Sequence, residues 1–239
     1  MAFERLDVLP LAVFILFPAT FLATYIIAVL LGHVEPDFPY ISDTGTYSPE
    51  SCIFGQLLNV GTLLLGLVIY VRYRQVAEYY SSYSLSPAVL SLNKMGVWFG
   101  LLSCLGLSFV ANFQETNVIT VHLTGAFLCF GFGTVYFWIH AVCSYHMQPL
   151  ANSLQLAHLR LALAVICTVF FILLSITGVL SHIQFRGIIS CQMIGSLLSA
   201  AKLVFYEILQ PAKTLWPAKT QAATEKWRSW YFWNKFMVK

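Results

Sequence analysis

Residues 9–31 read LPLAVFILFPATFLATYIIAVLL, a run in which no side chain is charged. The hydrocarbon core of a bilayer is about 30 Å thick, and a helix crosses it with about 20 residues at 1.5 Å each. The run exceeds the 7–15 apolar residues typical of a signal peptide and has no small-residue cleavage site. It therefore predicts an uncleaved transmembrane helix.

The chain as a whole has the composition of an integral membrane protein. Of 239 residues, 59% are hydrophobic and 10% charged, and the mean hydropathy is +0.75, which lies far outside the range of soluble domains. Five more apolar spans follow the first, at about 53–71, 95–112, 118–140, 161–181 and 188–209. We expect an all-α fold, a six-transmembrane-helix bundle over residues 1–210, followed by a tail of residues 211–239.

The distribution of basic residues predicts the orientation of this bundle. Short cytosolic loops are enriched in Lys and Arg. One side of the six-span arrangement carries eleven of them, at Arg5, Arg72, Arg74, Lys94 and Arg160 and at six positions of the tail. The other side carries Arg186 alone, together with several acidic residues. Both termini are therefore expected in the cytosol, and the 32–52 loop on the luminal or extracellular side.

The sequence offers little for catalysis. It contains no nucleophile elbow, phosphate-binding loop, Cys-x-x-Cys pair or zinc-binding histidine helix. Ionisable residues inside spans usually mark transport or catalytic sites, and the first five predicted spans hold only His122, at the outer end of the fourth, and His140, expected at the membrane interface. We predict a protein that is not an enzyme, with no catalytic residue, cofactor or metal, and we disfavour a transporter.

A polar stretch, PYISDTGTYSPESCIFG at residues 39–55, separates the first two spans. Asp43 is able to cap its own turn and Gly45 to adopt positive φ, so a well-capped connector explains much of it. Asn112, Gln114 and His122 are predicted on the same side, within reach of Gln56 or Asn59 on the second span. Hydrogen bonding between helices and recognition of a lipid headgroup or partner are both open roles. The candidate patch comprises Tyr40, Ser42, Asp43, Gly45, Glu50, Asn112, Gln114 and His122.

Small residues recur every four positions in the third and fourth spans. They are Gly96, Gly100 and Cys104 in one, and Gly125, Cys129 and Gly133 in the other. Such stripes allow close helix packing in lipid. We expect the two spans to pack along them, and homodimerisation through the first stripe is a less favoured alternative.

Four segments carry a family resemblance: HVEPDFPYISDTGTYSPESCIFGQLLN (33–59), LNKMGVWFGLLSCLGLSFVANFQET (92–116), VHLTGAF (121–127) and SYHMQP (144–149). Over roughly residues 1–181 the chain resembles the DRAM proteins, the damage-regulated autophagy modulators of the Frag/DRAM/Sfk membrane family. The resemblance implies six helices, cytosolic termini and a non-enzymatic regulator of autophagy in the lysosomal or another endomembrane. From about residue 187 the chain departs from the family pattern. The alternative is a plasma-membrane adaptor or lipid-organising, phosphoinositide-related protein, as in other branches.

The tail interleaves basic and aromatic residues. Residues 211–239 contain six Lys or Arg, one Glu and a cluster of aromatic side chains between 227 and 236. Because the tail is tethered beside the bilayer, we expect it to meet anionic lipids rather than nucleic acid. A disordered terminus without a ligand is the alternative. The expected partners are thus the lipid bilayer, anionic lipids at the tail, and membrane or autophagy proteins that the sequence does not name.

Overall fold

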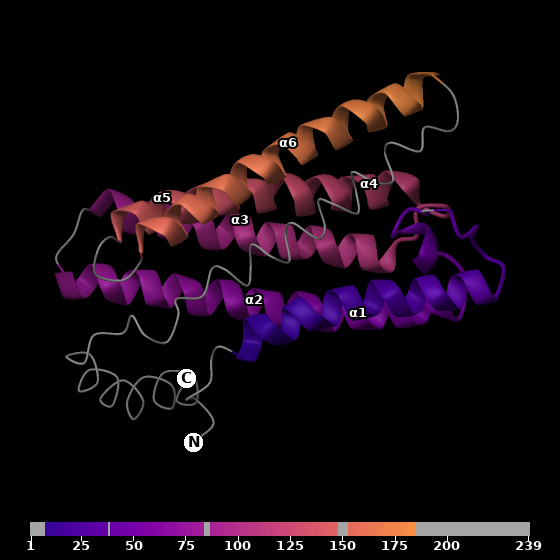
Figure 1. Ribbon diagram of the computed structural model, residues 1–239, viewed down its shortest axis with the longest axis horizontal. Coiled ribbons are helices and arrows are strands. Elements are labelled where there is room, and N and C mark those ends of the chain that lie inside the picture. Colours follow the sequence, from indigo (N-terminus) through magenta and orange to yellow (C-terminus); the bar gives the residue numbers. More distant parts are fainter. Residues whose placement is uncertain (1–7, 38, 84–86, 148–152, 185–239) are drawn as a thin grey trace.

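The computed structural model describes residues 8–37, 39–83, 87–147 and 153–184, and every regular element in these ranges is helical. The helices run along the long axis of the bundle (Figure 1). They are α1 (Val8–Leu30), α2 (Glu50–Tyr83), α3 (Pro87–Asn112), α4 (Ile119–Phe127), α5 (Gly133–His146) and α6 (Leu154–Gln184). A π-helical segment, Leu128–Phe132, joins α4 to α5 without a break, and a 3-10 turn, Asp43–Gly45, lies between α1 and α2.

Within the described ranges, five helical segments are long and apolar enough to cross a membrane, counting α4, the π segment and α5 as one. Large apolar side chains point outward from several of them, with Leu63 73% exposed and Trp98 70% exposed. A soluble protein rarely exposes large contiguous apolar surface, so this surface is suited to lipid. The expected sixth span at 188–209 and the tail at 211–239 lie outside the described residues.

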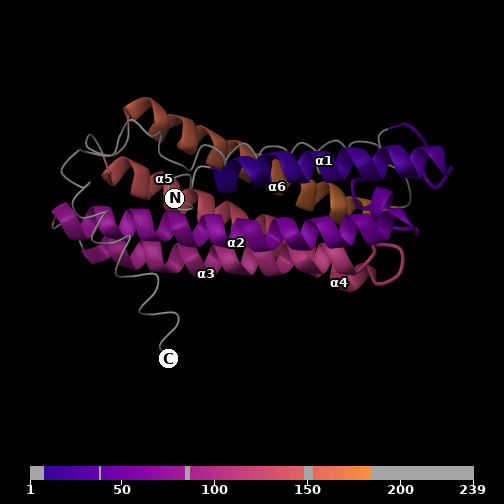
Figure 2. The same ribbon diagram turned by 90° about the horizontal axis from the view of Figure 1, so that it is seen from below.

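α3 is the central helix of the bundle. It packs on α2 on one side and on α4, the π segment and α5 on the other, while α1 packs on α2 and α6 on α5. Figure 2 shows α2 and α3 side by side along their length. A core of apolar side chains from α1, α2, α3, α5 and α6 fills the space between the helices.

The small residues of α3 lie at its contacts with different neighbours. A Cβ added at Gly100 would lie 3.0 Å from Ile69 of α2 and 3.1 Å from Tyr136 of α5, and one at Gly96 would lie 3.2 Å from Ile139 of α5. The closest approach of α3 to α4 is at Gly106, where an added Cβ would lie 2.5 Å from the carbonyl oxygen of Gly125. Gly133 is also buried. The glycines of the stripe in α3 therefore pack on two helices, α2 and α5, and the close contact with α4 uses a glycine outside the stripe.

Three helices extend beyond the predicted spans. α2 continues to Tyr83, α3 already begins at Pro87, and α6 begins at Leu154. Arg72 and Arg160, which we expected in loops, therefore lie inside helices, and both are buried. The prediction was wrong because a hydropathy window ends at a charged residue, whereas Arg is a good helix former and continues the helix.

Candidate functional site

The residues predicted as a patch gather at one end of the bundle, which we call the polar cap: residues 31–50 and 112–122. The cap begins where α1 ends at Leu30. Gly32 has φ +70°, and the amide of His33 donates to the carbonyl oxygen of Ala28 at 2.9 Å. A left-handed residue after a helix is a common C-terminal cap and favours glycine. This reversal directs the chain across the end of the bundle.

The 3-10 turn is held by its own side chains and by two helices. The carboxylate of Asp43 accepts a hydrogen bond from the amide of Tyr40, three residues earlier, at 3.2 Å. The hydroxyl of Thr44 lies 3.2 Å from that of Thr24 on α1. Gly45 has no positive φ, contrary to our expectation; Gly32 is the described glycine that does. Gly45 is needed because an added Cβ would lie 2.6 Å from the ring of Phe54.

Glu50 is the buried acid of the polar cap. It opens α2, is 0% exposed, and one carboxylate oxygen contacts Nδ1 of His33. The other oxygen has no hydrogen-bond partner among the described residues. Carboxylates in a first helical turn are stabilised by the helix dipole and by unpaired amide groups. The sequence predicted Glu50 as one of the loop residues of the patch. The structure shows in addition that its side chain is buried and contacts His33.

A second carboxylate links the loop to the turn between α3 and α4. Glu115 accepts a hydrogen bond from the hydroxyl of Ser42 at 2.5 Å and lies 3.9 Å from Nε2 of His122. Nδ1 of His122 lies 2.7 Å from the carbonyl oxygen of Phe113. Because a carbonyl oxygen only accepts, Nδ1 is the protonated nitrogen. Ser42, Glu115 and His122 thus form one chain of contacts.

Burial raises the pKa of Asp43 above its ordinary value, and the neighbouring charge of Glu115 raises it further. Both effects disfavour the ionised carboxylate. The amide of Tyr40 and the His122 ring act in the opposite direction. The cap therefore holds a carboxyl group that takes up a proton more readily than an ordinary Asp.

Asn112 and Gln114 lie in the same region but make separate contacts. The amide side chains of Asn112 and Asn59 bond to each other at 2.9 and 3.1 Å, and Ser108 donates to Asn59 at 2.8 Å. These bonds tie the end of α3 to α2 through Asn59. Gln114 accepts a bond from the side chain of Asn117 at 3.3 Å, which closes the α3–α4 turn.

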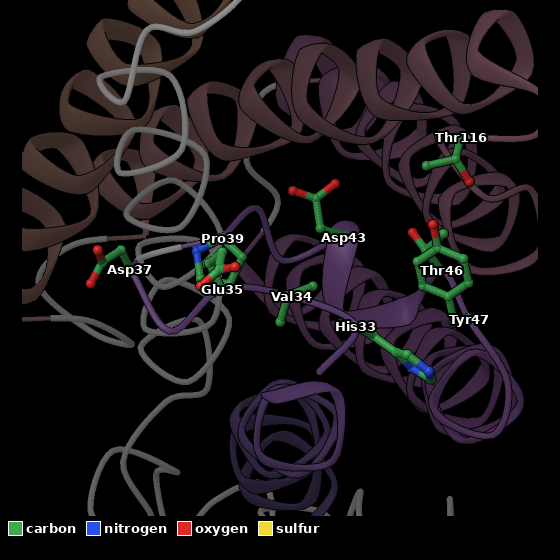
Figure 3. Close-up of a pocket in the computed structure, with 9 residues that line it drawn as sticks. All are labelled: His33, Val34, Glu35, Asp37, Pro39, Asp43, Thr46, Tyr47 and Thr116. Carbon is green, nitrogen blue, oxygen red and sulfur yellow. The ribbon is translucent and has the colours of Figure 1, made fainter. Parts of the chain in front are cut away.

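The cap surrounds an open recess of about 320 Å³. Figure 3 shows Asp43, Thr46 and Tyr47 around it, with Glu35 and Asp37 on the loop. Its lining contains three acidic side chains and His33, and the other lining residues are Val34, Pro39, Thr46, Tyr47 and Thr116. The recess is suited to a cationic or hydrogen-bonding group rather than to an anion. Of the predicted patch, Asp43 alone lines it.

Sequence reasoning missed a second polar group, near the opposite end of the bundle. Arg72 of α2 is 1% exposed and Arg160 of α6 is 0% exposed. Between them lies His140 of α5, 1% exposed, whose ring centroid is 4.3 Å from that of Tyr136. His140 is therefore not at a water interface as expected. Each of the two arginines directly borders a predicted apolar span, and this position is the sequence signal that could have indicated them.

The chain was compared with known proteins. The sequence model of the Frag1/DRAM/Sfk1/Cwh43P N-terminal domain matches residues 5–208. The chain is 46% identical over 169 residues to DNA damage-regulated autophagy modulator protein 2 of Homo sapiens, covering 70% of this chain and 61% of that protein. It is 42% identical over 148 residues to modulator protein 1 of Mus musculus, covering 62% of this chain and 61% of that protein.

A third relative is the modulator of macroautophagy TMEM150B of Xenopus tropicalis, 40% identical over 139 residues, which are 58% of this chain and 57% of that protein. The chain thus matches about three fifths of the length of these relatives. No solved structure matches it. The family match includes all of the described helices and the polar cap. The chain therefore belongs to the Frag1/DRAM/Sfk1/Cwh43 family of membrane proteins.

Proposed function

We propose that this protein regulates autophagy from the lysosomal membrane, and that it does so by binding rather than by catalysis. The observation that carries the proposal is the 46% identity over 169 residues to a protein named as an autophagy modulator. A more distant relative is named as a modulator of macroautophagy. The family match over residues 5–208 extends this support across the described bundle.

The arrangement of the polar cap supports a binding role. Ser42 and His122 are engaged with Glu115 or with backbone, and Asn112 is engaged with Asn59. A nucleophile needs an adjacent base oriented by a third group, and the cap contacts instead join loop to helix. What remains accessible is the acidic recess, which is suited to recognition.

The expected orientation would place this cap in the lysosomal lumen. Asp43 has a raised pKa, and two histidines contact carboxylates there. Asp43 would therefore gain a proton in an acidic compartment more readily than an ordinary aspartate. The charge of the cap would therefore differ between the lysosome and a neutral compartment, which gives the lysosomal location a physical consequence.

Localisation is the experiment that tests where the protein acts. A chain tagged at its C-terminus and expressed at low level should overlap a lysosomal membrane marker and co-purify with immunoisolated lysosomes. A matched fusion of an unrelated surface protein controls for mislocalisation by the tag. Exclusive labelling at the cell surface would contradict the lysosomal proposal and favour the alternative, an adaptor or lipid-organising protein of the plasma membrane.

A further inference from the structure

The arginine cluster is a set of buried polar side chains on three helices: Arg72 of α2, Tyr136, His140 and Ser144 of α5, Met147 at the end of α5, and Arg160 of α6. Arg160 donates to the hydroxyl of Ser144 at 2.7 Å. Ser144 in turn donates to the carbonyl oxygen of His140 at 2.6 Å. The charges of both arginines act on His140, and the charge of Arg72 also acts on Arg160. The two guanidinium groups are therefore neighbours.

The cluster lies at the depth of lipid headgroups. Arg72 follows Glu50 by 22 residues, which is about 33 Å of helix at 1.5 Å per residue. The hydrocarbon core is about 30 Å thick. Arg160 is six residues into α6, about 9 Å from its beginning. Both arginines thus lie near the end of the bundle opposite the polar cap, where the apolar layer gives way to phosphates.

The charge of Arg72 is poorly compensated by the described residues. Within the described ranges its hydrogen-bonding contact is the thioether sulfur of Met147, 4.0 Å from a terminal nitrogen, and its Nε has no partner. A thioether is a weak acceptor. In the part of the chain that the structure describes, Nδ1 of His140 is also buried without a hydrogen-bond partner. Buried cations in proteins are normally paired, since an uncompensated buried charge is strongly unfavourable.

The side chains of the cluster link α5 to both α2 and α6. α2 packs closely on α1 and α3, and α6 packs closely on α5. Arg72 reaches Met147 at the end of α5, while Arg160 reaches Ser144 on the same helix. A phosphate bound at Arg72 would therefore lie close to Arg160 and to His140, on which both arginine charges act.

We propose that the arginine cluster binds the phosphomonoester headgroup of an anionic membrane lipid. Arginine forks bind phosphate oxygens through paired hydrogen bonds. A phosphomonoester carries a charge of about −1.5 to −2 at pH 7, which matches two guanidinium groups, whereas a phosphodiester carries one negative charge. The acyl chains would lie along the apolar outer faces of the helices. The proposal does not rest on a role in autophagy.

The test measures lipid binding to the purified full chain in detergent by native mass spectrometry. The probes are phosphatidic acid, a phosphomonoester, and phosphatidylserine and phosphatidylcholine, which are phosphodiesters. We expect phosphatidic acid to bind at least about tenfold more tightly than phosphatidylserine, as one additional charge-assisted hydrogen bond would give. Equal binding of these two lipids by the wild-type chain would overturn the proposal, and this comparison needs no variant.

Variants then locate the binding. Arg72→Gln should remove the preference for phosphatidic acid, while Arg74→Gln, with the same charge change two residues away on α2, should retain it. Retention of the preference by Arg72→Gln, or its loss in Arg74→Gln, would contradict the assignment. If Arg72→Gln does not fold, Arg72→Lys keeps the charge but loses the fork, and should weaken the preference. Glycerol 3-phosphate distinguishes a lipid from a free phosphomonoester as the ligand. If it competes for the site as strongly as phosphatidic acid does, the lipid assignment is overturned.

Discussion

Replacing Gly106 by alanine tests the packing on which the bundle depends. An added Cβ at Gly106 would lie 2.5 Å from the carbonyl oxygen of Gly125 and 2.7 Å from Cβ of Leu128. Ordinary contacts begin at 3.4 Å, so relief of the Gly125 contact alone requires a shift of 3.4 − 2.5 = 0.9 Å, and the closer contact with the backbone nitrogen of Cys129 in the π segment requires more. The obstacle is backbone, which moves only if α3 separates from α4 and the π segment.

The magnitude follows from this separation. A gap of 0.5–1 Å forfeits about a quarter to a half of the dispersion energy of a contact. Overpacking of a well-packed interior costs about 1–3 kcal/mol. Alanine also gains about 1 kcal/mol over glycine in a helix interior. Gly66→Ala has the same gain without the clash, because its added Cβ would lie 3.9 Å from the nearest side chain, that of Leu101. The two variants should therefore differ by about 1–3 kcal/mol.

The assay is unfolding of the full chain in mixed micelles with increasing SDS, followed by circular dichroism. Gly106→Ala should unfold at a lower SDS fraction than Gly66→Ala, which should match or exceed the wild type. Equal midpoints for the two alanine variants would refute the close approach of α3 to α4 and the argument built on it.

Three further predictions concern the polar cap, the topology and the tail. Asp43→Asn should stabilise the fold at neutral pH, because the raised pKa makes the ionised Asp43 unfavourable in the folded state. That advantage should fade as the pH falls toward the ordinary Asp value of 3.8, and a difference in melting temperature independent of pH would contradict it. In a cysteine-free chain, single cysteines at the exposed Ser48 and Ser153 should react with an impermeant thiol reagent from opposite sides of the membrane, and same-side labelling would exclude the expected topology. A peptide of residues 211–239 should bind anionic vesicles with a blue shift of its tryptophan emission that salt reverses, since each basic residue near such a surface contributes about 1 kcal/mol; an unchanged spectrum at low salt would rule this out.

The helices could be predicted from hydropathy, because an apolar run long enough to cross a membrane has few alternatives to a helix in lipid. The first span at 9–31 and α1 at Val8–Leu30 differ by one residue at each end. The end of α2 and the beginning of α6 could not be predicted in this way, because Arg72 and Arg160 interrupt the apolar run without interrupting the helix. Arg74 and Lys94, also predicted in a loop, lie in α2 and α3 as well, and the orientation drawn from the charge bias stays a prediction.

The polar cap was only partly accessible to sequence reasoning. Asn112 was expected near Gln56 or Asn59, and it bonds Asn59. The contact of His33 with Glu50 joins residues 17 apart across the end of α1, and that of Ser42 with Glu115 joins residues 73 apart. Such pairs depend on how α1 to α4 are placed, which local patterns do not contain. Gly106 was missed for a related reason: it lies six residues beyond Gly100, outside the four-residue repeat.

Autophagic flux after acute depletion of the protein tests the central proposal most directly. Flux is measured as the accumulation of the lipidated autophagosome marker when lysosomal proteases are inhibited. The proposal predicts that this accumulation changes within hours of depletion and returns to its initial value on re-expression of the wild-type chain. An accumulation that depletion leaves unchanged, in cells where the chain is shown to be lost, would contradict a role in autophagy.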